Sequence, residues 1–250
     1  MGWEREQRQL ITSGELREQL GATAPHVASR LQQKGVLTRV GRGVYAINPL
    51  RSIGRPRSTS ALAAVAASLA DEAYYLGGLG ILNLHRLTDQ YYPGGVDVFI
   101  DRPRRPRRLA SVLVHFHVTD PDHLRAGVQK TTVEGSQVWV SDPERTVLDL
   151  LEYPSLTGGT AEAVKTAQTI LTRIDVPKLV RYALKLARPT TCRRIGFLLE
   201  RAGLPRRSWE PLLATVRGAA EGAALLPDAP KRGPYSSQWR LSVNDQAVTN

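Results

Sequence analysis

The alternation of apolar and polar residues near the start of the chain predicts a short helix. Thr12 and Glu15 stand three residues apart, which is the spacing of a capping box. Apolar residues then recur one turn apart, so this helix is expected over residues 13–20. The segment before it, residues 5–11, is expected to supply a supporting first helix.

A second helix is expected after only a few residues. Gly21 ends the first helix, Thr23 can cap the second, and Pro25 suits its first turn because no hydrogen bond is lost there. The apolar residues of this helix share one face, and Gly35 ends it. Two helices joined by so tight a turn are typical of a helix-turn-helix.

Two β-rich segments follow the second helix. Residues 36–40 and 44–47 are rich in β-branched and apolar residues, and the glycines on either side of Arg42 predict a turn between them. A hairpin with a basic tip, directly after a helix-turn-helix, indicates a wing. The pattern therefore predicts a winged helix-turn-helix domain over residues 1–48.

The exposed face of the second predicted helix carries side chains that can bond base edges or phosphates in the major groove. The candidate DNA contacts are Thr23, His26, Ser29, Arg30, Gln33 and Lys34 on the helix, with Arg39 and Arg42 on the wing. Charge favours this interpretation, because residues 1–57 contain ten Lys or Arg and four Asp or Glu. The alternatives are ordinary solvated residues, or a winged helix that binds protein.

The remainder of the chain predicts a basic linker and a larger domain. Residues 49–59 combine proline, glycine and arginine without periodicity, so we expect a linker there and one domain over residues 60–250. The expected fold class is α+β, with the winged helix followed by a larger mixed α/β domain. Expected helices cover residues 60–70, 80–87 and a segment starting at 142, with further helices to about 201; expected strands cover 74–76, 96–100, 112–118, 138–140 and, as an edge strand, 238–243.

Composition narrows the partners and the compartment. The chain has 250 residues, 42% of them hydrophobic, and a formal charge of +11, which favours nucleic acid, with an anionic membrane as the rival. The single cysteine, Cys192, excludes an internal disulfide and fits a reducing compartment. No apolar stretch is long enough to span a bilayer, so we expect a cytoplasmic protein without membrane contact.

Motifs of common enzymes are absent from the sequence. It contains neither a phosphate-binding loop nor a nucleophile elbow, and no cofactor, metal or catalytic residue is expected. His115 and His117 alternate on one predicted strand and could imitate a metal site, but solvated histidines are favoured. A nuclease could use Asp97, yet the neighbouring strand lacks a second carboxylate and a lysine.

Several segments, taken in order, resemble one protein family. They are residues 41–45 at the end of the wing, 74–80, 85–88, 138–150 and the glycine pair 158–159. This order resembles the AbiEi-type antitoxins of type IV toxin–antitoxin systems. The resemblance implies a DNA-binding domain that represses its own operon, and a second domain that counteracts a nucleotidyltransferase-like toxin. Binding at inverted repeats is expected because one winged helix reads only a few base pairs and operator symmetry normally mirrors two copies of the protein. An enzymatic second domain, transferring a phosphoryl group to the toxin or acting as a nuclease, is the alternative.

An arginine-rich segment between two predicted strands is the most unusual local feature outside the winged helix. It contains Arg102, Arg104, Arg105, Arg107 and Arg108, and its prolines should keep the backbone extended. It could contact DNA phosphates, the toxin or the toxin's RNA substrate. A solvated loop is the remaining alternative.

Overall fold

In the computed structural model of the chain, the described residues form an α+β fold, as expected, and they divide into two compact units. The first unit draws on residues 1–76, 93–124 and 128–140, and the second on 77–92, 125–127 and 141–250. The residues described are 9–49, 60–90, 92, 94–109, 112–217, 223–230 and 232–244. Residues 50–59 of the expected linker lie outside them, so the boundary between residues 48 and 60 stays a prediction.

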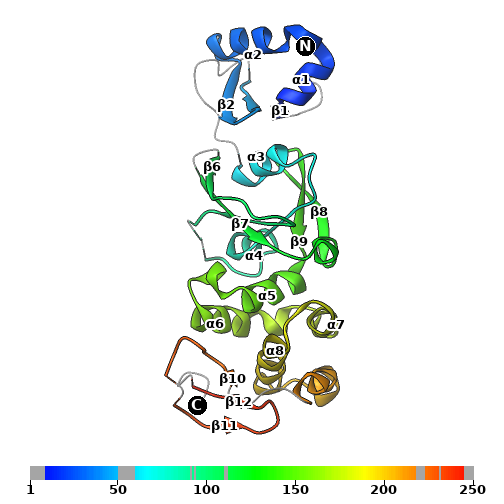
Figure 1. Cartoon of the computed structure of the whole chain (residues 1–250), viewed down its shortest axis with the longest axis vertical. Coiled ribbons are helices and arrows are strands. Elements are labelled where there is room, and N and C mark those ends of the chain that lie inside the picture. The colour runs from blue at the N-terminus through cyan, green and yellow to red at the C-terminus, as the bar shows by residue number, and fades with distance from the viewer. Residues whose placement is uncertain are drawn as a thin grey trace. The chain divides into compact units, whose positions relative to one another are not determined.

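The N-terminal part of the first unit combines two helices with a small antiparallel sheet (Figure 1). The helices are α1 (Ser13–Leu20) and α2 (Ala24–Gln33), joined by a 3-10 turn (Gly21–Thr23). The strands are β1 (Leu10–Thr12), β2 (Leu37–Gly41) and β3 (Val44–Ile47), in the order β1-β3-β2. The predicted first helix, tight turn and wing hairpin are confirmed.

The supporting helix expected over residues 5–11 is wrong for its described end. Leu10 and Ile11 form strand β1, which pairs with β3, while residues 5–8 lie outside the described residues. A strand suits this segment because neighbouring side chains of a strand point to opposite faces, and both faces are buried here. Ile11 packs with the core of α1 and α2, and Leu10 packs in a separate cluster on the other face.

This N-terminal sheet is therefore buried on both faces. One face packs against α1 and α2 through a cluster that includes Leu16 and Leu31. On the other face, Leu10, Val44 and Ala46 pack against Ala63 of helix α3 (Ala61–Ser68). Small side chains on α3 let the helix lie close to the strands. The helix expected at residues 60–70 is thus a third layer over the winged helix.

A six-stranded mixed sheet follows α3, in the order β6-β7-β5-β4-β9-β8 (Figure 1). Its core pair is parallel, with Val96 of β5 opposite Val114 of β7. β6 runs antiparallel to β7 at the edge. The strands are β4 (Tyr75–Gly77), β5 (Val96–Ile100), β6 (Arg107–Leu109), β7 (Val112–Val118), β8 (Val128–Val133) and β9 (Ser136–Ser141). The bounds expected for β5 and β7 are confirmed.

Helices form most of the second unit. The central one, α5, packs against α4, α6, α7 and α8 and has all but its first residue buried. The helices are α4 (Leu79–Leu84), α5 (Pro143–Glu152), α6 (Thr160–Ile170), α7 (Val176–Leu186) and α8 (Pro189–Arg201). Among the residues described, no helix combines the length and apolar character needed to cross a membrane.

A polar network fixes the start of α5. The Asp142 carboxylate caps the helix by accepting from the Arg145 backbone N–H at 2.8 Å. It also accepts from Tyr182 Oη at 2.8 Å and lies 3.0 Å from Lys178 Nζ. The Arg145 guanidinium is 2% exposed and pairs with Asp149 at 2.8 Å. Buried charges are costly unless they are paired, and the charges of this segment are paired with one another. We therefore infer that the segment has a structural role.

The environment of this network shifts two ionisation equilibria. Burial, followed by the hydrogen bond to Asp142, raises the pKa of Tyr182 to about 12. Burial alone would lower the pKa of Lys178, but its bonds to Glu144 and Asp142 raise it above the ordinary value. Both groups therefore stay protonated at neutral pH, and the tyrosine remains a hydrogen-bond donor.

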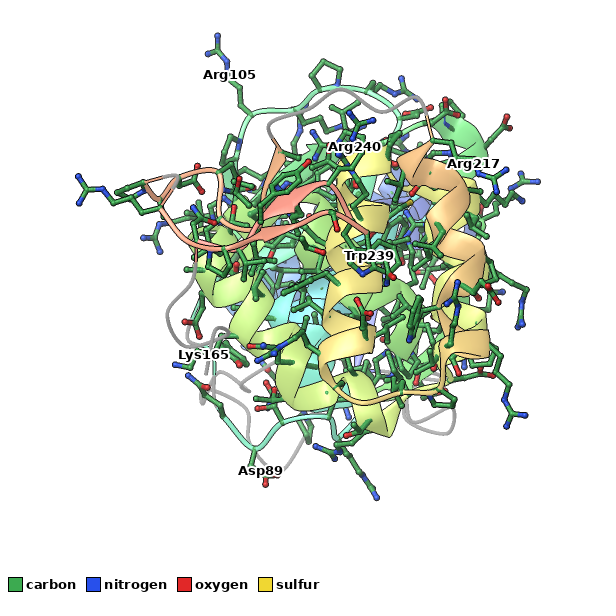
Figure 2. The ribbon with its side chains drawn as sticks, turned by 90° about the horizontal axis from the view of Figure 1, so that it is seen from below. Asp89, Arg105, Lys165, Arg217, Trp239 and Arg240 are labelled. Atoms are coloured by element: carbon green, nitrogen blue, oxygen red, sulfur yellow. The ribbon has the colours of Figure 1, made fainter. Side chains whose placement is uncertain are left out.

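The C-terminal strand expected as an edge over residues 238–243 is instead central. β12 (Leu241–Ser242) pairs in parallel with β10 (Ala223–Ala224) and antiparallel with β11 (Tyr235–Ser236). Just before β12, Trp239 is fully buried against α8 (Figure 2), and its indole N–H donates to Glu200 at 2.6 Å. The pairing partners lie far apart in sequence, which local patterning cannot reveal.

The packing of Trp239 on α8 gives a stability prediction. A Cβ added at Gly196 would lie 2.1 Å from Trp239 Cη2, so Gly196→Ala should destabilise the chain by about 1–3 kcal/mol through overpacking. Thermal unfolding measures the change. The control is Gly80→Ala, because an added Cβ there meets nothing within 4 Å. Equal melting temperatures for the Gly196 variant and the unmodified chain would contradict the packing.

Candidate nucleic-acid interface

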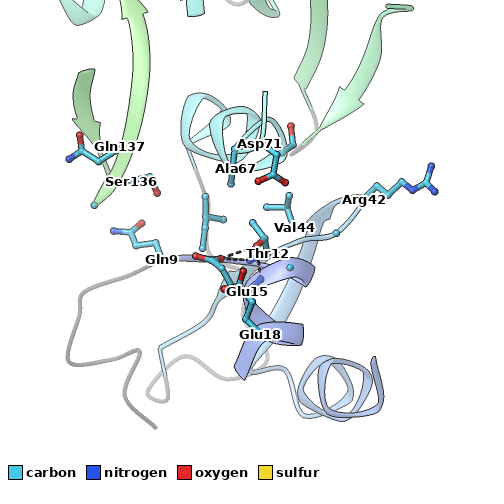
Figure 3. A pocket seen from close by; sticks show the side chains of 16 residues that line it. Gln9, Thr12, Glu15, Glu18, Arg42, Val44, Ala67, Asp71, Ser136 and Gln137 are labelled. Atoms are coloured by element: carbon cyan, nitrogen blue, oxygen red, sulfur yellow. Dashed lines mark hydrogen bonds between the residues drawn. The ribbon is translucent and has the colours of Figure 1, made fainter. Parts of the chain in front are cut away.

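The helix-turn-helix begins with a complete capping box (Figure 3). The Glu15 backbone N–H donates to Thr12 Oγ1 at 3.1 Å, and the Thr12 backbone N–H donates to Glu15 Oε2 at 2.8 Å. The Ser13 N–H donates to the carbonyl of Gly43 at 2.7 Å. Because Gly43 lies in the turn between β2 and β3, the start of α1 is fixed to the wing.

Helix α2 divides cleanly into a buried and an exposed face. Ala24, Ala28 and Leu31 are buried in the core of the winged helix. The opposite face consists of exposed polar residues, all of them predicted DNA contacts: His26, Ser29, Arg30, Gln33 and Lys34. The structure therefore brings these five side chains to one surface, while their contact with DNA stays a prediction.

Thr23 does not cap α2 as expected. It occupies the N-cap position and is exposed, but its hydroxyl donates to the Leu20 carbonyl at 2.7 Å and accepts no bond from the helix backbone. Its backbone is helical because the 3-10 turn runs directly into α2, whereas a capping residue needs an extended backbone. The hydroxyl therefore stabilises the turn.

The wing presents two exposed arginines. Gly43 allows the tight turn because its φ of 72° lies in the left-handed region. Arg39 on β2 is exposed, and its Nε donates to the Gly41 carbonyl at 3.3 Å. Arg42 at the turn is exposed, at the rim of the neighbouring cavity (Figure 3). Both positions suit contact with a phosphate backbone.

A cavity of about 540 Å³ lies beside the wing (Figure 3). Its lining includes the acidic residues Glu15, Glu18 and Asp71, which outnumber the single basic residue, Arg42. Carboxylates repel a polyanion, so this cavity does not suit phosphate. The basic candidates for DNA contact therefore lie on the exposed faces of α2 and the wing.

The arginine-rich segment connects β5 to β6. Arg104 donates to the carboxylate of Glu72, and Arg107 donates to the Ser68 hydroxyl at 3.2 Å. Both guanidinium groups also lie over the ring of Phe116, at 5.9 and 5.6 Å from its centroid. Arg102, Arg105 and Arg108 are exposed. The segment is thus held by two of its arginines and presents the other three to solvent.

Two of the residues considered for enzyme chemistry, Asp97 and His117, are paired with each other. His117 Nε2 lies 2.8 Å from Asp97 Oδ1, so the aspartate considered for a nuclease is paired with a histidine. Within the described part of the chain, no three His, Cys, Asp or Glu residues are placed to hold a metal. Burial raises the pKa of the Cys192 thiol to about 11, which disfavours the nucleophilic thiolate.

The strands, the two helices and the exposed basic face together define the class of the N-terminal part, a winged helix-turn-helix. Residues 3–48 match a family model, AbiEi_4, described as "Transcriptional regulator, AbiEi antitoxin". The match confirms the resemblance to AbiEi-type antitoxins in this segment and supports a regulator rather than an enzyme.

One solved structure shows that the similarity of fold extends beyond the winged helix. The crystal structure of the RV2827C protein from Mycobacterium tuberculosis aligns over 96% of this chain and 88% of that chain, with a TM-score of 0.68 and 16% sequence identity. No curated protein sequence matches the chain. At this identity the likeness establishes a shared fold.

The capping box gives a prediction for the helix-turn-helix. Thr12→Ala removes the acceptor for the Glu15 N–H, and such a loss costs about 0.5–2 kcal/mol of stability. Chemical denaturation of the full chain measures the effect. Thr12→Ser keeps the hydroxyl and should recover most of the stability. An alanine variant as stable as the serine variant would show that the cap contributes nothing.

Proposed function

We propose that the chain is a cytoplasmic antitoxin and the transcriptional autorepressor of its own type IV toxin–antitoxin operon. The winged helix binds operator DNA at inverted repeats, and residues 60–250 counteract a nucleotidyltransferase-like toxin. The observation that carries the proposal is the match of residues 3–48 to the AbiEi antitoxin regulators. The exposed polar face of α2 supports it independently.

The geometry of α2 supports a recognition helix. Arg30 and Gln33 are three residues apart, so they project side by side from the exposed face. An arginine can bond guanine O6 and N7, and a glutamine can bond adenine N6 and N7, both in the major groove. The buried face of α2 rests on α1 and the sheet, which keeps the helix rigid during binding.

The wing supplies contacts of a different kind. Arg39 and Arg42 flank the hairpin turn and would reach phosphates or the minor groove, which adds affinity without reading sequence. One winged helix reads only a few base pairs. Two copies on inverted repeats therefore account best for recognition of a unique operator.

The antitoxin activity is assigned to residues 60–250, because the winged helix alone offers a small surface. This part carries its own buried core, including the α5 network of Asp142, Arg145 and Asp149. A folded body of this size gives a broad surface for a protein partner.

The first test of the proposal is DNA recognition by α2. Arg30→Ala and Gln33→Ala should each weaken binding to the operator by ~1–3 kcal/mol while leaving nonspecific binding little changed, because one base contact is worth that much discrimination. Arg42→Ala should weaken both alike. Footprinting and titration of the upstream region measure these effects, with Arg181→Ala, an exposed arginine of α7, as control.

Two results would contradict this placement of the recognition helix. One is protection of DNA without any repeated site. The other is an operator affinity that none of the three substitutions changes.

A second test separates repression from protection. The full chain carrying Arg30→Ala and Gln33→Ala should lose repression yet still rescue cells that express the toxin from an independent promoter. A fragment starting at residue 58 should also protect cells. The full-length variant is the stronger arm, because truncation uncovers the face of α3 that packs on β1 and β3. If the variants are soluble and folded but cells that express the toxin do not grow, the division of labour is contradicted.

A further inference from the structure

The arginine-rich segment, residues 102–108, ends directly beside the wing. Leu109, the last residue of β6, is buried and packs on Gly41, the last residue of β2. A Cβ added at Gly41 would lie 2.5 Å from Leu109 Cδ1, so the leucine occupies the space that a larger residue would need. Since Gly41 immediately precedes the wing turn, the basic segment and the basic wing adjoin.

Helix α3 and its C-terminal extension support both structures. Ala63 of α3 packs on the sheet that carries the wing, while Ser68 at the end of α3 and Glu72 just beyond it bond Arg107 and Arg104. Phe116 on β7 lies beneath both guanidinium groups. The backbone of the segment is thereby held at a fixed position relative to the wing.

The other three arginines of the segment are exposed. Arg102 Nε donates to Asp101 Oδ1 at 3.3 Å, yet 67% of the Arg102 side chain is exposed. Arg105 projects far from the ribbon (Figure 2). Arg108 is exposed because it lies on a strand between the inward-directed Arg107 and Leu109. Pro103 and Pro106 restrict the intervening backbone, so little conformational entropy remains to be lost on binding.

We propose that residues 102–108 form a second DNA-binding element, in which Arg102, Arg105 and Arg108 contact the phosphates that flank the site of the wing. The inference rests on the proposed function, which places the DNA on the winged helix. A duplex fits better than an acidic protein, because the exposed side chains are guanidinium groups with no large apolar residue among them. Such contacts add affinity and orientation without reading sequence.

The test compares two triple variants of the full chain. One carries Arg102→Ala, Arg105→Ala and Arg108→Ala. The matched control carries Arg181→Ala, Arg207→Ala and Arg217→Ala, which removes the same charge from exposed arginines of the second unit. Binding is titrated over a range of salt concentrations with three duplexes: the operator with flanks, the operator without flanks and a random sequence as long as the first.

Counterion release makes the expected result quantitative. Each lost phosphate contact reduces the magnitude of the slope of log K against log salt by about 0.9. The slope of the first variant should therefore be smaller by about 2–3 on the flanked and random duplexes. It should behave as the unmodified chain on the operator without flanks. The ratio of operator to random affinity at fixed length should stay the same. Hydroxyl-radical footprinting should show lost protection of the flanking backbone only.

Two results would overturn the inference. One is the same slope for both triple variants. The other is an unchanged slope combined with lost protection from the toxin, which would assign the segment to the toxin. The random duplex separates this inference from the proposed function. A chain without operator preference whose random-duplex slope still falls would refute the repressor and retain the second DNA-binding element.

Discussion

The burial of both faces of the N-terminal sheet is the constraint on which the winged helix depends. Leu10 and Val44 are buried between the sheet and α3, and burying each such side chain contributes roughly 1.5–3 kcal/mol. That is a large share of the ~5–15 kcal/mol that stabilises an ordinary domain. The wing is therefore held in place by the layer behind it, and any element attached to α3 has a defined position beside the wing.

Local signals in the sequence were sufficient wherever neighbouring residues decide the structure. The capping box at Thr12 and Glu15 predicts the bounds of α1, and the apolar run of β5 predicts that strand. Strand β1 cannot be predicted from its sequence, because three residues are too few to show a period. Leu10 and Ile11 are both apolar because α3 buries the second face of the sheet, and that contact is not visible in the local sequence. The central position of β12 likewise depends on partners distant in sequence.

The candidate interface was predictable to the same extent. Helical periodicity is enough to place Arg30 and Gln33 on the exposed face of α2. It cannot show that Arg104 bonds Glu72, because that contact joins residues far apart in the sequence and in different elements. Sequence alone therefore presents the five arginines of residues 102–108 as equivalent, whereas the structure separates those that hold the segment from those that face solvent.

The pairing of β12 bears on the order in which the protein becomes active during its synthesis. The elements of the helix-turn-helix and the helix α3 that covers its sheet are complete by residue 68, so this part can form while the rest is still being translated. Trp239 and β12 must leave the ribosome before they can fill the space at Gly196 and join β10 to β11. A nascent chain thus gains its helix-turn-helix long before its second unit closes, and a ribosome stalled late on the message would display the first without the second.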